Sequence, residues 1–194
     1  MAATAQGPQG QPPFKGWVGL HTNYPGTQLE FAVSALSSDK HISLVTLGIG
    51  SNDVLLLLSQ CGTDPNPTAC VNTQLPGVLQ TYAANLTRIL TEIRAAPYQG
   101  QLMLVGYYAP SADLIPIAQA LNATMLAVGA QFHTTYADGF TAFQTAAARY
   151  GGDVCKAGLL IHLSPTTCDI HPSPAGRDLL AATVLAAASG VKIH

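Results

Sequence analysis

The stretch Leu44–Val54 (LVTLGIGSNDV) is the part of the chain that decides its fold. Its first half belongs to the nearly all-apolar, β-branched run Ile42–Ile49, which is typical of a strand buried on both faces of a parallel sheet. A glycine-rich corner follows, and Asp53–Ser59 then predicts a short helix. A buried strand that turns directly into a helix indicates an α/β fold.

Apolar strands and amphipathic helices continue to alternate along the rest of the chain. Two further buried strands are predicted at Gln101–Tyr108 and Gly158–Leu163, and an earlier one at Phe14–Leu20. Apolar residues at helical spacing predict helices over Thr27–Ser38, Leu75–Ala95, Leu114–Phe132, Phe140–Tyr150 and Pro174–Ser189. We therefore expect a flavodoxin-like, three-layer α/β/α sandwich with a parallel sheet.

The composition is that of a weakly charged globular chain. Lys plus Arg number 8 and Asp plus Glu number 10 among 194 residues, so a cluster of basic residues for nucleic-acid phosphates is missing and no nucleic-acid partner is expected. No run of about 18 uncharged apolar residues exists, so stable membrane insertion is not expected either. Residues 1–13, rich in Gly, Pro, Gln and Ala, are interpreted as a flexible leader, and residues 14–194 as one α/β domain.

The four cysteines fall in two local pairs, Cys61 with Cys70 and Cys155 with Cys168. Four cysteines permit three connectivities, and the sequence alone does not choose between them. Each local pair brackets a loop-like stretch, which suits a loop-closing disulfide, whereas a zinc site would need tighter Cys-x-x-Cys or Cys/His spacing. We therefore expect disulfides, no metal, and a secreted or periplasmic location.

Candidate functional residues follow the strands, because parallel sheets bind ligands beyond their carboxyl ends. Asn52 follows the first buried strand, where a side-chain amide can stabilise an oxyanion; capping the helix near Asp53 is the alternative. His171, with the carboxylate of Asp169 nearby, lies before the last helix and suits a general base; a loop histidine bonded to a backbone carbonyl is the alternative. Nucleotide-binding motifs are absent, so no cofactor is expected. The residues that can line an acyl or sugar pocket are Tyr107, Tyr108 and Pro110.

Taken together, GIGSND after a strand and DIHPSPAG before the last helix resemble two blocks of the SGNH (GDSL) hydrolase family. The resemblance runs from about Tyr24 to Val191. It implies a serine-type esterase or lipase that cleaves acyl or acetyl esters of small molecules, lipids or glycans. By the same resemblance, Asn52 is an oxyanion donor, His171 the general base and Asp169 the acid that orients it.

Two features depart from the family's pattern. The family's acid usually stands three residues before the histidine, whereas Asp169 stands two before it, and Cys168 offers a backbone carbonyl as the alternative orienting group. The family's nucleophilic serine lies in a GDS block near the start of the fold, but this chain has no GDS and no serine before Ser34. Ser51 lies at the mouth of the predicted sheet without a G-x-S-x-G elbow. The chain thus resembles an N-terminally shortened hydrolase, either an esterase or a catalytically incompetent module that binds a ligand or associates with itself.

The shortened start has a consequence for the strand Ile42–Ile49. In the family, the first strand of the fold lies beside this one. Without that neighbour an apolar strand becomes an open edge, which is prone to pairing with other chains. We expect either that Phe14–Leu20 covers the edge or that two chains pair across it as a homodimer.

Overall fold

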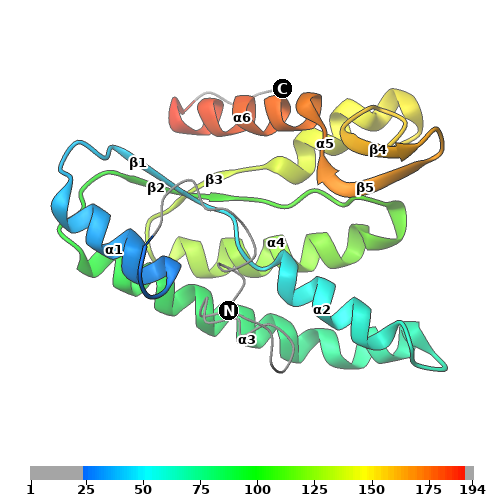
Figure 1. Ribbon diagram of the computed structural model, residues 1–194, viewed down its shortest axis with the longest axis horizontal. Helices are drawn as coiled ribbons and strands as arrows, with labels where there is room; N and C mark the ends of the chain where they lie inside the picture. The colour runs from blue at the N-terminus through cyan, green and yellow to red at the C-terminus, as the bar shows by residue number, and fades with distance from the viewer. Residues whose placement is uncertain (1–23, 191–194) are drawn as a thin grey trace.

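The structure is a computed structural model that describes residues 24–190. Three parallel strands form the central sheet in the order β1 (Leu44–Leu47), β2 (Gln101–Val105), β3 (Thr135–Ala137). The sheet lies between α3 and α4 on one side and α6 on the other, as Figure 1 shows. The expected α/β sandwich with a parallel sheet is confirmed. The interpreted leader, residues 1–13, and the predicted strand Phe14–Leu20 lie outside the described residues.

The helices form where apolar residues recur at helical spacing. They are α1 (Gln28–Ser38), α2 (Ser51–Cys61), α3 (Pro67–Ala95), α4 (Ile115–Ala130), α5 (Gly139–Ala147) and α6 (Pro174–Ala188). The start of α1 is a capping box, in which Thr27 Oγ1 accepts the Glu30 amide at 3.1 Å and Glu30 Oε2 accepts the Thr27 amide at 2.6 Å. The start of α3 lies earlier than predicted, because the Asn66 side chain caps a polar first turn with Pro67 at its first position.

The core fills the space between the sheet and the helices α3 and α4. Leu102, Met103 and Leu104 of β2 are 1%, 0% and 1% exposed, because β2 has a strand on each side and a helical layer on each face. Leu102 and Leu104 share one core cluster with Leu86 and Leu90 of α3, both 0% exposed. Each such side chain contributes about 1.5–3 kcal/mol of burial free energy.

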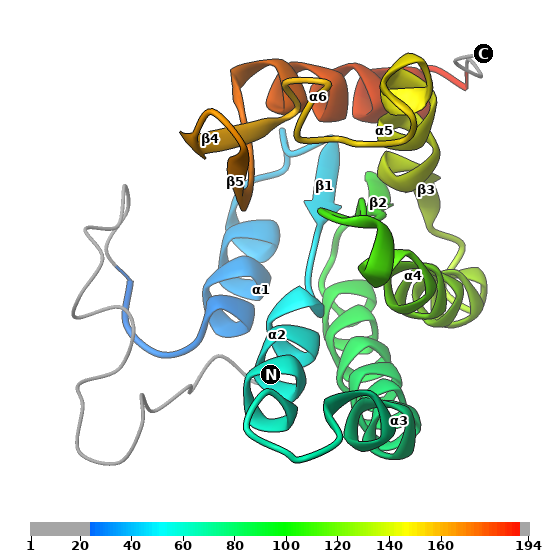
Figure 2. The same cartoon turned by 90° about the vertical axis from the view of Figure 1, so that its right-hand side faces the viewer.

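The third strand of the sheet is not the predicted one. The run Gly158–Leu163 was expected to join the parallel sheet, but β4 (Leu160–Ser164) pairs antiparallel with β5 (Thr167–Pro172) in a separate hairpin. The third place belongs to β3, a three-residue strand between α4 and α5. The prediction was wrong because it took an apolar run to be a buried strand, whereas Ile161 and Leu163 of β4 are 42% and 68% exposed. Figure 2 shows the hairpin beside α6.

Two disulfides tie the described chain together, Cys61–Cys70 and Cys155–Cys168. The first joins the end of α2 to the start of α3, and the second joins the segment after α5 to β5. The expectation of two local disulfides is confirmed.

One helical stretch of the described chain, Ala112–Ala130, is long and apolar enough to cross a membrane by length and composition. It includes α4, whose buried residues pack into the core, among them Leu121 and Met125. In this structure the stretch therefore acts as a core helix.

Candidate active site

An apolar cavity of about 330 Å³ opens beyond the carboxyl ends of β1 and β2. Its walls include Leu55 and Leu58 of α2 and Ile117 and Leu121 of α4. Asn52 and His171 both line it, as do three residues for which a pocket role was expected, Tyr107, Tyr108 and Pro110. The tertiary structure thus brings the two separate sequence blocks to one cavity, at the end of the sheet where parallel α/β folds bind ligands. We call this the carboxyl-end cavity.

Asn52 reaches the cavity because of a sharp turn at Gly50. Gly50 has φ 118°, in the left-handed region, and the Tyr82 ring occupies the space that a Cβ would need. Glycine therefore allows β1 to turn directly into α2. Gly50 is the N-cap residue and no side chain caps the helix, so the alternative role of Asn52 as a cap is wrong. Asn52 instead lies exposed in the first turn, where its amide and the positive end of the helix both favour negative charge.

His171 and Asp169 lie on one strand, β5, rather than on the loop that the sequence predicted. Side chains two residues apart on a strand share a face, which explains how an acid two positions before the histidine can reach it. The imidazole Nδ1 is 2.9 Å from Asp169 Oδ2, and Asp169 Oδ1 accepts the Ile170 amide at 2.6 Å. The ring thus contacts the carboxylate, so the Cys168 carbonyl is not needed to orient it.

The electrostatics of this pair favour an ionised carboxylate. The hydrogen bond from His171, first among several causes, holds the pKa of Asp169 below its usual range. An ionised carboxylate only accepts hydrogen bonds, so in the neutral imidazole the proton lies on Nδ1 and the lone pair on Nε2. A lone pair on Nε2 is what a general base requires.

Tyr108 supports the same strand in a way that the sequence did not indicate. Its hydroxyl donates a 2.7 Å hydrogen bond to the carbonyl of Ile170, the residue between Asp169 and His171. The Tyr108 ring stacks on Phe143 at 4.2 Å between centroids, and burial raises the pKa of Tyr108 to about 12. The hydroxyl therefore stays protonated and remains a donor. Only tertiary contact links these residues, which are 62 positions apart.

Asn122 is a second residue beside the carboxyl-end cavity that the sequence did not indicate. Its side chain, 6% exposed, accepts the Tyr107 amide at 2.8 Å and donates to the Tyr107 carbonyl at 2.7 Å. The sequence offers one signal for this role, which is a polar residue in the middle of an apolar helix. The two bonds attach α4 to the end of β2 and so hold the cavity wall in place.

Ser51 is the one serine among the described residues that line the carboxyl-end cavity. It lies close enough to the Tyr107 hydroxyl to lower the pKa of that tyrosine, against a larger rise caused by burial. Within the described chain, the imidazole of His171 is hydrogen-bonded to Asp169 and not to Ser51.

A different cluster, of Cys155, His162 and Cys168, has the donor types of a metal site. Its ligand atoms lie within 4.8 Å of one another. Both sulfurs are bonded to each other in a disulfide, however, and metal binding by cysteine requires thiolates. These residues therefore do not form a metal centre in this state of the protein.

Comparison with known proteins identifies the family. The model of the GDSL-like lipase/acylhydrolase family matches residues 9–179, so the chain belongs to this family and the resemblance drawn from the two sequence blocks is confirmed. No curated protein matches the sequence.

Solved structures share the fold. Phospholipase A1 from Streptomyces albidoflavus NA297 is 22% identical with a TM-score of 0.57, over 80% of this chain and 75% of that one. A catalytic mutant of Axe2, an acetylxylan esterase from Geobacillus stearothermophilus, is 17% identical with a TM-score of 0.51, over 86% of this chain and 70% of that one. At these identities the likeness is one of fold.

Proposed function

We propose that this chain hydrolyses carboxylic esters whose acyl group lies in the carboxyl-end cavity. One observation carries the proposal: the 2.9 Å contact between His171 and Asp169 lies at an apolar cavity that Asn52 also lines. Membership of the GDSL-like lipase/acylhydrolase family supports it. The phospholipase and the acetylxylan esterase with the same fold support it further.

Each residue has a defined part in the proposed reaction. His171 Nε2 takes the proton from the attacking hydroxyl as its oxygen adds to the ester carbonyl, and Asp169 stabilises the imidazolium that forms. The Asn52 amide donates a hydrogen bond to the carbonyl oxygen as it becomes an oxyanion. The tetrahedral intermediate then expels the alcohol, which receives the proton from His171. If water attacked, the acyl group leaves as the free acid; if a serine hydroxyl attacked, a water activated by His171 adds to the acyl-enzyme and releases the acid in a second round.

The apolar wall of the cavity favours an acyl chain over a bare acetyl group. Each CH₂ that leaves water contributes about 0.8 kcal/mol, which is about fourfold in kcat/KM if it is realised in the transition state. We therefore expect kcat/KM for p-nitrophenyl esters to rise from acetate through butyrate to hexanoate.

The test of the proposal is the turnover of this ester series by the full chain and by His171→Ala. Loss of the general base lowers kcat by about 10²–10⁴-fold. His171 is 67% exposed, so the substitution leaves the fold intact, which circular dichroism checks. Equal turnover by the two proteins rejects the proposed role of His171.

A second function, a binding module without turnover, is favoured by one specific observation. The single serine among the described residues at the cavity has no hydrogen bond to His171, whose imidazole contacts Asp169. Labelling with a serine-directed phosphonate separates the possibilities. Turnover with labelling that Ser51→Ala removes identifies Ser51 as the nucleophile, and turnover without labelling identifies an attacking water. Ester binding without any turnover supports the binding module.

A further inference from the structure

Tyr82 of α3 is buried in the core, yet its hydroxyl has no hydrogen-bond partner. It is 1% exposed, and among the described residues this hydroxyl is the one buried side-chain polar atom without such a bond. Burial, together with the neighbouring Tyr107 and Asp53, raises the pKa of Tyr82 above its ordinary value, so the hydroxyl stays protonated. A buried hydroxyl that makes no hydrogen bond lowers stability. What Tyr82 contributes to the structure therefore comes from its ring.

The ring of Tyr82 lies directly against the turn between β1 and α2. A Cβ atom placed on Gly50 would lie 2.5 Å from Cε2 of the ring and 3.0 Å from Cζ, so only glycine fits there. Gly50 is the N-cap residue of α2, with φ 118°. Its carbonyl accepts the amides of Asp53 at 3.2 Å and Val54 at 3.4 Å, at the start of the helix. The Tyr82 ring thus supports the residue from which α2 begins.

Helix α2 is held against α3 at both of its ends. At its carboxyl end, Cys61 is bonded to Cys70 near the start of α3. At its amino end, Gly50 packs on Tyr82, and no side chain caps the helix there. Asn52 lies between these supports, exposed in the first turn and lining the carboxyl-end cavity. A shift of this first turn would move the Asn52 amide relative to the cavity.

We propose that Tyr82 is a positioning residue for Asn52: its ring holds the Gly50 turn in the place from which the Asn52 amide reaches the oxyanion. This role rests on the proposed function, because the oxyanion belongs to the ester reaction. Tyr82 is not among the residues that line the carboxyl-end cavity, so it acts through Asn52 and not on the acyl group. A displacement of about 1 Å in a catalytic group costs up to about a hundredfold in rate.

A double-mutant cycle with Asn52 tests this role. Tyr82→Ala is expected to lower kcat by about tenfold to a hundredfold with KM unchanged, because the turn loses its support while the cavity wall remains. The same substitution in an Asn52→Ala background is expected to cause no further loss, because the amide that the turn positions is absent. Tyr82→Phe keeps the ring and is expected to retain kcat. It is also expected to raise the midpoint of thermal unfolding, because it removes an unpaired hydroxyl.

Leu90→Ala is the matched control on the same helix. Leu90 is 0% exposed, belongs to the same core cluster as Tyr82 and lies about 12 Å further along α3. Its truncation also leaves a cavity in the core and lowers stability. It is expected to keep kcat when all variants are measured below their melting temperatures. Where Tyr82→Ala does not fold, Tyr82→Leu takes its place, since leucine retains more of the buried volume.

Amide hydrogen exchange followed by NMR gives a readout that needs no turnover. The amides of Asp53 and Val54 bond to the Gly50 carbonyl and report on local opening of the turn. Tyr82→Ala is expected to speed their exchange by about tenfold or more, and Leu90→Ala to leave it unchanged. A chain that turns over no ester but shows this response keeps Tyr82 as the support of the Asn52 turn and rejects only the ester reaction.

Four results would overturn the role of the Tyr82 ring. The first is that Tyr82→Ala changes neither kcat nor the exchange of the two amides. The second is an equal loss of kcat in Tyr82→Ala and Leu90→Ala, which indicates a general softening of the core. The third is the same loss with and without the Asn52 amide, since the effect then does not pass through Asn52. The fourth is a loss in Tyr82→Phe as large as in Tyr82→Ala, which assigns the role to the hydroxyl.

Discussion

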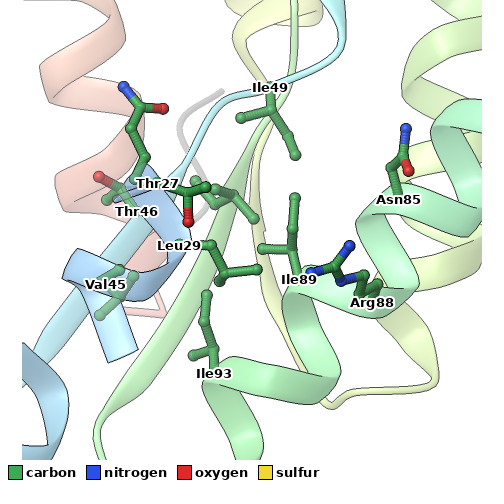
Figure 3. Close-up of a pocket in the computed structure, with 12 residues that line it drawn as sticks. Thr27, Leu29, Val45, Thr46, Ile49, Asn85, Arg88, Ile89 and Ile93 are labelled. Carbon is green, nitrogen blue, oxygen red and sulfur yellow. The ribbon is translucent and has the colours of Figure 1, made fainter. Parts of the chain in front are cut away.

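A second cavity, of about 210 Å³, lies along the outer edge of β1 between α1 and α3 (Figure 3), and we call it the edge groove. The carboxyl-end cavity and the edge groove both adjoin β1 and are both largely apolar, yet they differ in their polar groups. The carboxyl-end cavity has His171 and Asn52 at its surface, with Asp169 bonded to the histidine. The edge groove borders an edge of β1 that pairs with no described strand, and its larger polar side chains are Gln28 of α1 and Asn85 and Arg88 of α3. Apolar volume alone therefore does not mark a site of chemistry. A histidine with a carboxylate beside it is what the proposed ester hydrolysis requires, and of these two cavities only the carboxyl-end cavity has one among its described residues.

The two neighbouring strands β1 and β2 show the same contrast in their burial. Leu104 of β2 is 1% exposed, while its partner in register, Leu47 of β1, is only partly buried. Both sequences are apolar, so the difference comes from what lies beside them. β2 has a strand on each side, and β1 has one described neighbour.

The largest expected effect concerns the polar groups of the carboxyl-end cavity. Asn52→Ala removes the proposed oxyanion donor and is expected to lower kcat by about 10²–10³-fold with little change in KM. Gln60→Ala, at the exposed far end of the same helix, is the control and is expected to retain full activity. A loss of less than tenfold in Asn52→Ala would show that the cavity lacks the polar function by which we distinguish it from the groove.

The next effect separates the two disulfides. Removing either by Cys→Ser at both positions is expected to lower the free energy of unfolding by about 3 kcal/mol, because both close short loops of similar length. Only the pair Cys155 and Cys168 connects to β5, the strand of Asp169 and His171. We therefore expect ester turnover by the folded protein to fall only when this pair is removed. Thermal unfolding and kinetics measured below the melting temperature test both statements, and equal kinetic losses in the two variants would refute the second.

The smallest effect tests the support that Tyr108 gives to β5, the strand of Asp169 and His171. Tyr108→Phe keeps the stacking on Phe143 but removes the hydrogen bond to Ile170, a net loss of about 0.5–1.5 kcal/mol. As a positioning effect, this lowers kcat by about two- to tenfold and leaves KM for the acetate ester unchanged. Tyr150→Phe, a partly exposed tyrosine outside the carboxyl-end cavity, is the control. A change in KM alone would show that Tyr108 lines the cavity without positioning the base.

Most of the fold follows from local pattern. The apolar run before Gly50 and the helical spacing of Leu86 and Leu90 predicted β1 and α3 correctly, because a buried strand and a buried helix face each require such residues. β3 escaped prediction because three residues are too few to show a pattern. β4 was assigned to the wrong sheet because the apolar run that suggested a buried strand lies largely exposed in a hairpin.

For the site, the sequence by itself determined which residue types are available: an amide at Asn52, an imidazole at His171 and a carboxylate at Asp169. It also favoured the local disulfide pairs, since each pair brackets a loop-like stretch, but the choice among three connectivities came from the structure. Only the tertiary structure decided that Asn52 and His171 line one cavity, that β5 brings Asp169 within 2.9 Å of the imidazole, and that Tyr108 supports the strand between them. The physical reason is that these contacts join residues far apart in the chain or depend on strand geometry, which the positions of the residues in the sequence do not specify.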